Sequence, residues 1–215
     1  MLPEPTAMLP VAMPWLDLAG LAVFAVSGAL VAAKHRQTIV TLVFFALITG
    51  VGGGTLRDLM LGAPVFWVHD ARVPVVCLIA AVAVWATPER WWRGSALDWF
   101  DAVGLAAYAV YGAAKASGHG ITPIPAAMLG VMSACVGGII RDIIAGEPSI
   151  LMRPELYVTA AALASTSYVG LILLGTPSSV AGPLAALAGF ALRGAAIHYR
   201  LALPAYPAKG WEDRG

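Results

Sequence analysis

The chain has 215 residues, of which 60% are hydrophobic and only 12% are charged, and its formal net charge is +1. A soluble domain carries roughly 25% charged residues, so this composition excludes a water-soluble globular protein and indicates an integral membrane protein. The near-zero net charge and the lack of a long basic run exclude a nucleic-acid partner.

Seven apolar segments are candidates to cross a bilayer, which takes about 20 residues of helix. In chain order they cover residues 15–33, 38–62, 71–87, 97–117, 123–146, 155–174 and 180–200. The sequence therefore predicts an all-α membrane protein with a single transmembrane domain over residues 15–200. Residues 1–14 and 201–215 are predicted to form tails on either side of it.

Basic residues are distributed unequally between the two sides of this predicted domain. One side carries Lys34, Arg36, Arg90, Arg93, Arg153, Arg200, Lys209 and Arg214, and the other carries only Arg72 and Lys115. Because cytoplasmic loops are enriched in Lys and Arg, we expect an extracellular N-terminal tail and a cytoplasmic C-terminal tail. This orientation requires an odd number of crossings, which agrees with seven.

The chain also contains an internal repeat with an offset of 84 residues. The motif Gly-Gly-x-x-Arg-Asp at 53–58 recurs at 137–142, and the same offset relates Gly28 to Gly112. Each copy, 15–87 and 97–174, contains three predicted crossings, so the second copy enters the membrane from the opposite side. The sequence thus predicts two inverted three-helix repeats followed by a seventh helix over 180–200, which is typical of membrane transport proteins.

Glycines cluster within the second and fifth predicted helices. They are Gly52, Gly53 and Gly54 in the first copy and Gly137 and Gly138 in the second. Because glycine costs about 1 kcal/mol relative to alanine inside a helix, the clusters predict a kink or an unwound turn. The alternative is that small residues let neighbouring helices pack closely. Val136 stands where the first copy has Gly52, so we expect the fifth helix to kink less.

Each glycine cluster is followed by an arginine and an aspartate, Arg57 with Asp58 and Arg141 with Asp142. Charges inside a membrane are costly and usually functional, so we expect these four residues to line a polar route. Adjacent residues on a helix do not face each other. We therefore expect the pairs to cross the repeat interface, Arg57 with Asp142 and Arg141 with Asp58. The alternative for the arginines is that they extend to the lipid headgroups.

Other polar residues in the first and fourth segments are further candidates for the lining. They are Ser27, Tyr108, Tyr111 and Lys115. The tyrosines have core packing or an interfacial belt as alternatives, and Lys115 has an interfacial anchor as its alternative. If Lys115 faces the pathway, conduction is expected to depend on voltage. Asp17 and Asp101, at the start of the first and fourth segments, are interpreted as helix caps.

The sequence contains no residue pattern that is typical of an enzyme. The glycines are not followed by Gly-Lys-Ser/Thr, so they do not form a phosphate-binding loop. The histidines lack metal-ligand spacing, and the inverted repeat places His35 and His119 on opposite sides of the membrane. We therefore expect neither an enzyme nor a metal site.

The doubled Gly-Gly-x-x-Arg-Asp signature, followed in each copy by Gly and Pro, resembles the trimeric intracellular cation (TRIC) channels. The later residues are Gly62 and Pro64 in one copy and Gly146 and Pro148 in the other, and the resemblance covers about residues 12–200. It is closer to the prokaryotic members, which implies the plasma membrane. The resemblance implies a homotrimer in which each subunit has its own pore for monovalent cations, potassium being preferred over sodium.

By position, the resemblance assigns the pore kink to Gly52, Gly53, Gly54, Gly137 and Gly138, and the associated charges to Arg57, Asp58, Arg141 and Asp142. It implies no cofactor beyond permeant potassium or sodium ions, and leaves bound lipid open. Two alternatives remain. A secondary transporter of a small solute such as glycine has similar architecture, and a structural membrane subunit is disfavoured by the intramembrane charges.

Overall fold

The computed structural model describes residues 13–92, 94–152 and 154–204, with side chains from residue 18 onward. This part of the chain forms seven α-helices: α1 (Met13–Lys34), α2 (Ile39–Met60), α3 (Arg72–Ala86), α4 (Ala96–Gly118), α5 (Pro123–Ala145), α6 (Val158–Leu173) and α7 (Ser178–Tyr199). Two short 3-10 helices, η2 (Glu89–Trp92) and η3 (Ile150–Met152), precede α4 and α6. The predicted all-α class and the seven helices are confirmed.

The helices match the needs of a bilayer in length and in surface chemistry. Among the described residues, α2, α5 and α7 are each long and apolar enough to cross a membrane, and residues 18–34, α3 and α6 form shorter apolar helices. Large apolar side chains also cover outward-facing positions, among them Val40, Phe44, Ile79, Ile124, Met128 and Leu187. Such a surface suits lipid better than water.

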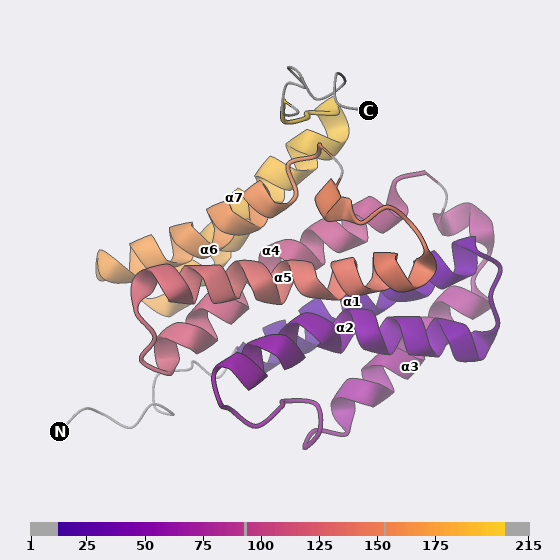
Figure 1. The fold of residues 1–215 in the computed structure, drawn as a ribbon, viewed down its shortest axis with the longest axis horizontal. Helices are drawn as coiled ribbons and strands as arrows, with labels where there is room; N and C mark the ends of the chain where they lie inside the picture. The colour runs from indigo at the N-terminus through magenta and orange to yellow at the C-terminus, as the bar shows by residue number, and fades with distance from the viewer. Residues whose placement is uncertain (1–12, 93, 153, 205–215) are drawn as a thin grey trace, which may run out of the picture.

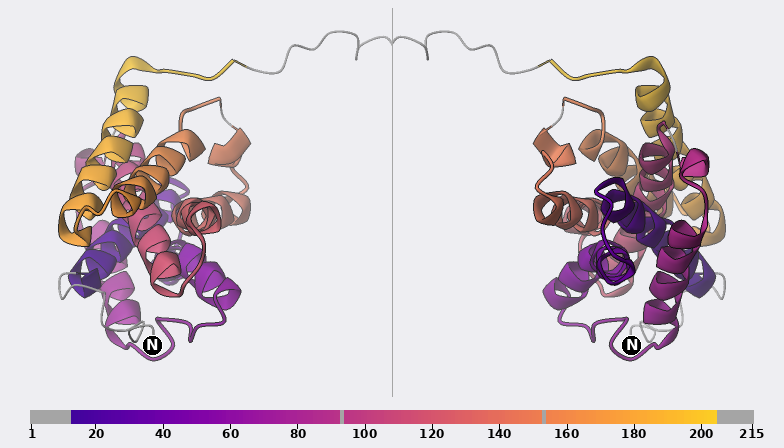
Figure 2. Two further views of the ribbon diagram at one scale, coloured as in Figure 1. Left: turned by 90° about the vertical axis from the view of Figure 1, so that its left-hand side faces the viewer. Right: turned by 90° about the vertical axis from the view of Figure 1, so that its right-hand side faces the viewer.

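The helices are arranged as two related groups of three. Helices α2 and α5 lie side by side in the middle of the molecule (Figure 1), with α1 against α2 and α4 against α5. Helix α3 packs on α1 and α2, as α6 packs on α4 and α5. Helix α7 packs on α4 and α6, on the opposite side of the molecule from α2 (Figure 2). These pairings are those that the predicted repeats and extra helix require.

The glycines serve helix packing, and the predicted unwound turn is wrong. Helix α2 is continuous through Gly52–54, and α5 is continuous through its own glycines. A Cβ on Gly53 would collide with the backbone carbonyl of Ser133 in α5, and a Cβ on Gly137 would collide with the carbonyl of Thr49 in α2. Thr49 and Ser133 are themselves related by the repeat offset. The crossing of α2 and α5 is therefore symmetric, and it requires residues without a side chain.

The glycine that follows each charged pair ends its helix in the same way. Gly62 and Gly146 adopt left-handed backbone angles, with φ of 64° and 68°. The next amide donates back to the carbonyl of the aspartate, Ala63 to Asp58 and Glu147 to Asp142, each a hallmark of this helix ending. The turn sends the following loop back over the helix end, where it meets the aspartate side chain.

Candidate functional site

One buried charge cluster, here called the first cluster, consists of Arg57, Asp58 and Lys115. The Nε and Nη2 atoms of Arg57 each lie 2.8 Å from Oδ1 of Asp58, and Nζ of Lys115 lies 2.8 Å from the same oxygen. The other oxygen of Asp58 accepts a 3.0 Å hydrogen bond from the amide of Phe66 in the returning loop. The Arg57 guanidinium lies over the ring of Tyr111, 5.0 Å from its centroid, so the cation is held between a carboxylate and an aromatic face.

The second cluster consists of Arg141, Asp142 and Asp101. Nε and Nη2 of Arg141 lie 2.9 and 2.8 Å from Oδ1 of Asp142, and Nη1 lies 2.6 Å from Oδ1 of Asp101. The same Nη1 contacts the hydroxyl of Ser27, which donates to Asp101 over 3.1 Å. The free oxygen of Asp142 accepts a 2.9 Å bond from the amide of Ile150. Each repeat thus builds the same unit of Arg, Asp and loop amide.

These contacts correct three expectations about the charged residues. The predicted cross-interface pairs are wrong: each arginine instead pairs with the aspartate next to it, because its long side chain curls back along the helix to reach that carboxylate. The arginines do not extend to lipid headgroups, since Arg57 is 1% exposed and Arg141 is 2% exposed. Asp101 is not a helix cap, because α4 begins at Ala96 and the Asp101 side chain pairs with Arg141. The side chain of Asp17 lies outside the described residues.

The remaining candidates fall at different places in the bundle. Lys115 is not a free interfacial anchor, because its ammonium binds Asp58. Tyr111 lies on Arg57, whereas Tyr108 is buried and packs edge-on against Phe24 at 5.3 Å between ring centroids. Gly54 and Gly138 lie next to the first and second clusters, against Phe66 and Tyr157 respectively. Their role in a pore stays a prediction.

The two clusters carry opposite net charge although the repeat gives both an arginine and an aspartate. Helix α4 supplies the third charge to each, Lys115 to the first and Asp101 to the second. Counting ionised side chains, the first cluster has a net charge of +1 and the second of −1. The two α4 residues are 14 positions apart, which corresponds to about 21 Å along the helix.

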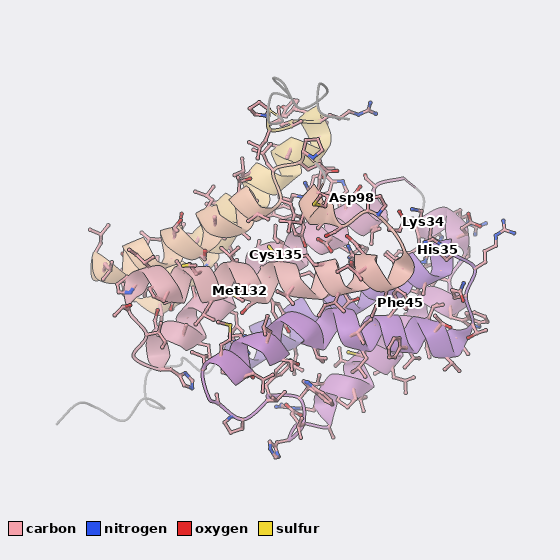
Figure 3. All side chains as sticks on the ribbon, in the orientation of Figure 1. Lys34, His35, Phe45, Asp98, Met132 and Cys135 are labelled. Carbon is pink, nitrogen blue, oxygen red and sulfur yellow. The ribbon has the colours of Figure 1, made fainter. Side chains whose placement is uncertain are left out.

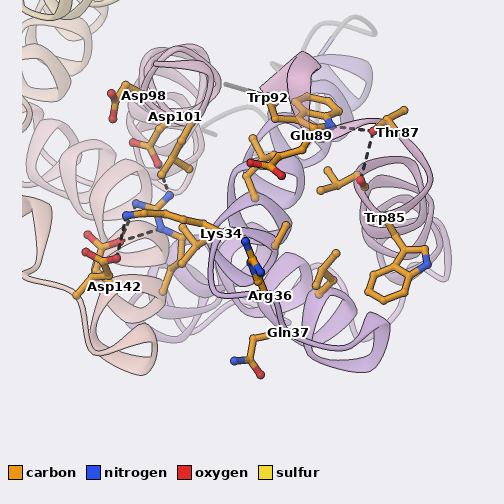
Figure 4. Close-up of a pocket in the computed structure, with 18 of the residues that line it drawn as sticks. Lys34, Arg36, Gln37, Trp85, Thr87, Glu89, Trp92, Asp98, Asp101 and Asp142 are labelled. Atoms are coloured by element: carbon orange, nitrogen blue, oxygen red, sulfur yellow. Dashed lines mark hydrogen bonds and ion pairs between the residues drawn. The ribbon is translucent and has the colours of Figure 1, made fainter. Parts of the chain in front are cut away.

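A cavity of about 800 Å³ opens next to the second cluster. Asp98, Asp101 and Asp142 lie on one side of it, and Trp85, Thr87 and Trp92 lie on the other (Figure 4). Among the described residues that line the cavity, five are carboxylates (Glu89, Asp98, Asp101, Asp142 and Glu147) and three are cations (Lys34, Arg36 and Arg141). The lining is therefore negative overall and favours the entry of cations.

A link between the two repeats lies at the edge of this cavity. Oε1 of Glu147, after α5, lies 2.9 Å from Nζ of Lys34 and 3.1 Å from Nε2 of His35, both at the end of α1. Lys34 and His35 occupy the end of the molecule near Asp98 (Figure 3). The hydrogen bond from Lys34, followed by its positive charge, lowers the pKa of the Glu147 carboxyl from its ordinary value.

Sequence reasoning missed three charged residues that the fold makes prominent. Asp101 is the equivalent of Asp17 and was interpreted as a cap, and Glu147, between Gly146 and Pro148, was given no role. Arg193 is a lone charge in the last third of α7 and is fully buried. Intramembrane position alone was a sufficient signal for it. Among the described residues, no group of three or more His, Cys, Asp or Glu side chains is arranged to hold a metal ion.

Comparison with known proteins agrees with this geometry. A family model described as "Glycine transporter" matches residues 14–89 and 98–175, one match for each repeat. The UPF0126 inner membrane protein YadS of Escherichia coli K12 is 36% identical over 200 residues, covering 89% of this chain and 95% of its own. A UPF0126 membrane protein of Vibrio cholerae is 35% identical over 198 residues, covering 89% and 81%.

The solved structures decide the family. The TRIC trimeric intracellular cation channel orthologue from Rhodobacter sphaeroides superposes with a TM-score of 0.83 at 39% sequence identity, covering 88% of this chain and 99% of that one. The chain belongs to the TRIC channel family. A prokaryotic TRIC channel crystallised in 0.5 M KCl gives a TM-score of 0.82 at 25% identity. This TRIC family member is thus a multi-pass membrane protein whose structural neighbours are cation channels.

Proposed function

We propose that this TRIC family member is a potassium-preferring monovalent cation channel, active as a homotrimer with one pore in each subunit. The carrying observation is the negative cavity that ends on the second cluster. Carboxylates that outnumber cations at a water-filled entrance raise the local concentration of permeant cations. The Rhodobacter sphaeroides orthologue is described as a trimeric cation channel, which supports the cation channel and the homotrimer.

The proposed route runs from the cavity along the glycine crossing of α2 and α5 to the first cluster, enclosed by α1 and α4. Ions meet the net negative second cluster at one end of this route and the net positive first cluster at the other. The first cluster therefore opposes cations, and conduction requires Lys115 or Arg57 to move. Plasma-membrane location, with the N-terminus outside and the C-terminus in the cytoplasm, completes the proposal.

A glycine transporter is the second candidate, favoured by the description of the matching family model. A glycine site needs a free cation or amide donors for the substrate carboxylate. All three guanidinium nitrogens of Arg141 already contact Asp142, Asp101 or Ser27. Arg57 lies beneath Tyr111 and is 1% exposed. Neither arginine offers an open carboxylate site in this conformation, which favours the channel.

The test is planar-bilayer recording of the purified protein under a potassium chloride gradient. Unitary current steps that reverse near the potassium equilibrium potential support the channel, and replacing potassium by sodium on one side ranks the two ions. Steps that reverse near the chloride potential contradict the cation assignment. Absence of unitary steps at every voltage, together with saturable uptake of radiolabelled glycine into liposomes, establishes the transporter instead.

A further inference from the structure

Helix α7 has no counterpart in the repeat, yet it buries a charged residue next to the second repeat. Arg193 is 0% exposed, and its Nη2 lies 2.7 Å from Oε2 of Glu155, which precedes α6. The guanidinium carbon also lies 5.3 Å from the ring centroid of Tyr157. Among the described residues, none of the three guanidinium nitrogens has a hydrogen-bond partner, so the contact with Glu155 is an ion pair without hydrogen-bond geometry. One ion pair and one ring do not offset the cost of burying this charge, so stability alone does not account for Arg193.

Tyr157 connects Arg193 to the second cluster. The tyrosine is 1% exposed and lies at the start of α6. Its hydroxyl oxygen is 3.1 Å from the point where a Cβ on Gly138 would stand, and Oδ1 of Asp101 and Nη2 of Arg141 are each 3.7 Å from that point. The hydroxyl therefore lies near the Arg141–Asp101 pair at the base of the cavity, and among the described residues it has no hydrogen-bond partner.

The first repeat lacks this connection. A Cβ on Gly54, the equivalent of Gly138, would stand 2.6 Å from a ring carbon of Phe66, which is an apolar neighbour without a hydroxyl. Glu155 and Tyr157 correspond by the offset to Ala71 and Val73, neither of which carries a polar side chain. The connection from α7 through Tyr157 is thus specific to the cluster that borders the cavity.

The backbone ties the end of α7 to the same loop. Ala202, just after α7, forms an antiparallel bridge with Glu155, and the amide of Leu203 donates to the carbonyl of Pro154 over 2.6 Å. The end of α7 and the segment that carries Glu155 and Tyr157 are therefore held together by backbone and side-chain contacts. A shift of α7 relative to α4 displaces Tyr157 with it.

We propose that Arg193 is a positioning residue for conduction. With Glu155 it holds Tyr157 against Gly138 and so fixes the Arg141–Asp101 pair at the base of the cavity. Helix α7 then sets the rate of ion flow without lining the route. This proposal rests on the channel function proposed above, and it makes Arg193 act through Tyr157 rather than on the ion directly.

The test uses Arg193→Met and Tyr157→Phe in the full-length protein. Arg193→Met leaves Glu155, whose side chain is 36% exposed and reaches water, whereas Glu155→Gln would leave Arg193 charged and buried and is avoided. Tyr157→Phe removes a single oxygen. Each variant is expected to lower unitary conductance by about threefold or more, within the range that networked residues contribute to coupling. Arg193→Lys, which keeps the charge, is expected to recover part of the loss.

A double-mutant cycle separates positioning from simple support of the fold. If Arg193 acts through Tyr157, the double variant has the same unitary conductance as the lower of the two single variants. Independent, multiplying losses overturn the proposal. The matched controls are Tyr168→Phe, a buried tyrosine on α6, and Arg90→Met, an exposed arginine; both should conduct as the wild type does.

Wild-type conduction is measured in the same preparations. If the wild type conducts and both single variants match it, the positioning role is wrong while the channel function stands. If the wild type shows no unitary currents, the channel function and the positioning role fall together. Size-exclusion chromatography of each variant confirms that conductance is compared between assemblies of the same size.

Discussion

The first and second clusters share a scaffold and differ in sign. In both, an arginine binds the adjacent aspartate, whose second oxygen accepts an amide of the returning loop. Helix α4 then adds Lys115 to the first cluster and Asp101 to the second. The comparison teaches that the repeat builds the same unit of arginine, aspartate and loop amide twice. Residues outside the motif then set the net charge of each cluster.

The largest expected effect comes from neutralising one aspartate in each cluster, Asp58 in the first and Asp101 in the second. Asp58 is the carboxylate bound to both cations of the first cluster, so Asp58→Asn leaves the buried Arg57 and the part-buried Lys115 without their counter-charge and is expected to cost about 3–5 kcal/mol. Asp101→Asn leaves Arg141 paired with Asp142 and is expected to cost only about 1–3 kcal/mol. Thermal unfolding of the purified variants in detergent measures both.

Asp70→Asn is the matched control for these two variants, because Asp70 pairs with Arg72 on the exposed surface. Its unfolding temperature is expected to match that of the wild type, because surface substitutions away from buried features have little effect. Equal destabilisation by Asp58→Asn and Asp101→Asn would contradict the extra cost that we expect from leaving Lys115 without the Asp58 carboxylate.

The glycine crossing offers a second, smaller test, because here the two halves are expected to behave alike. Gly53→Ala and Gly137→Ala each drive a Cβ into a backbone carbonyl of the partner helix, which cannot rotate away. Each is expected to cost roughly 1–3 kcal/mol through forced separation of α2 and α5. Thermal unfolding measures the cost, and unequal costs would contradict the symmetry of the crossing.

Gly170→Ala in α6 is the control, since nothing lies within 4 Å of its added Cβ. Because alanine favours helix by about 1 kcal/mol over glycine, this variant should unfold at the same temperature as the wild type or a higher one. Destabilisation of all three variants by a similar amount would assign the cost to the helix backbone and not to the crossing.

The predictability of the fold and of the site differed for physical reasons. Helix number and boundaries followed from apolar length, a local property, and all boundaries lie within three residues of those expected. The repeat offset likewise identified Arg57 and Arg141. Pairing was not predictable in the same way, because a flexible arginine reaches the adjacent aspartate as readily as one on another helix.

The glycines show the same limit from the backbone side. Their cost within an isolated helix favours unwinding, but the contact between α2 and α5 stabilises the continuous helix, and only the three-dimensional crossing of Thr49 with Gly137 reveals this. The third charged residue of each cluster was equally unpredictable from the sequence. Lys115 and Asp101 lie outside the motif, and their partners depend on where α4 meets α2 and α5.

Changing the sign of a cluster tests the electrostatic half of the comparison. Lys115→Met removes the charge that makes the first cluster positive and leaves Arg57 paired with Asp58. A unit charge about 10 Å from an ion changes its energy by roughly 1.7 kcal/mol at an effective dielectric constant of 20. We therefore expect cation conductance to rise by about two- to tenfold and rectification to weaken. Asp101→Asn should lower conductance. If the current–voltage curves of both variants match those of the wild type, the charges of the two clusters do not affect ion flow.

The smallest expected effect concerns the link between repeats at the cavity edge, which the first cluster lacks in the described residues. The pKa of Glu147 is below its ordinary value of 4.5, so the folded state binds the proton less readily than the unfolded state does. Its contribution to stability is complete above that ordinary value and is lost as the pH falls below it, through the depressed folded-state pKa. Glu147→Gln should therefore narrow the gap in unfolding temperature between neutral pH and a pH below 4.5.

Because the Lys34 side chain is 63% exposed, salt screens its ion pair with Glu147. The gap in unfolding temperature of the wild type should therefore shrink toward that of the variant in high salt. A salt-independent gap would place its origin in the buried clusters instead.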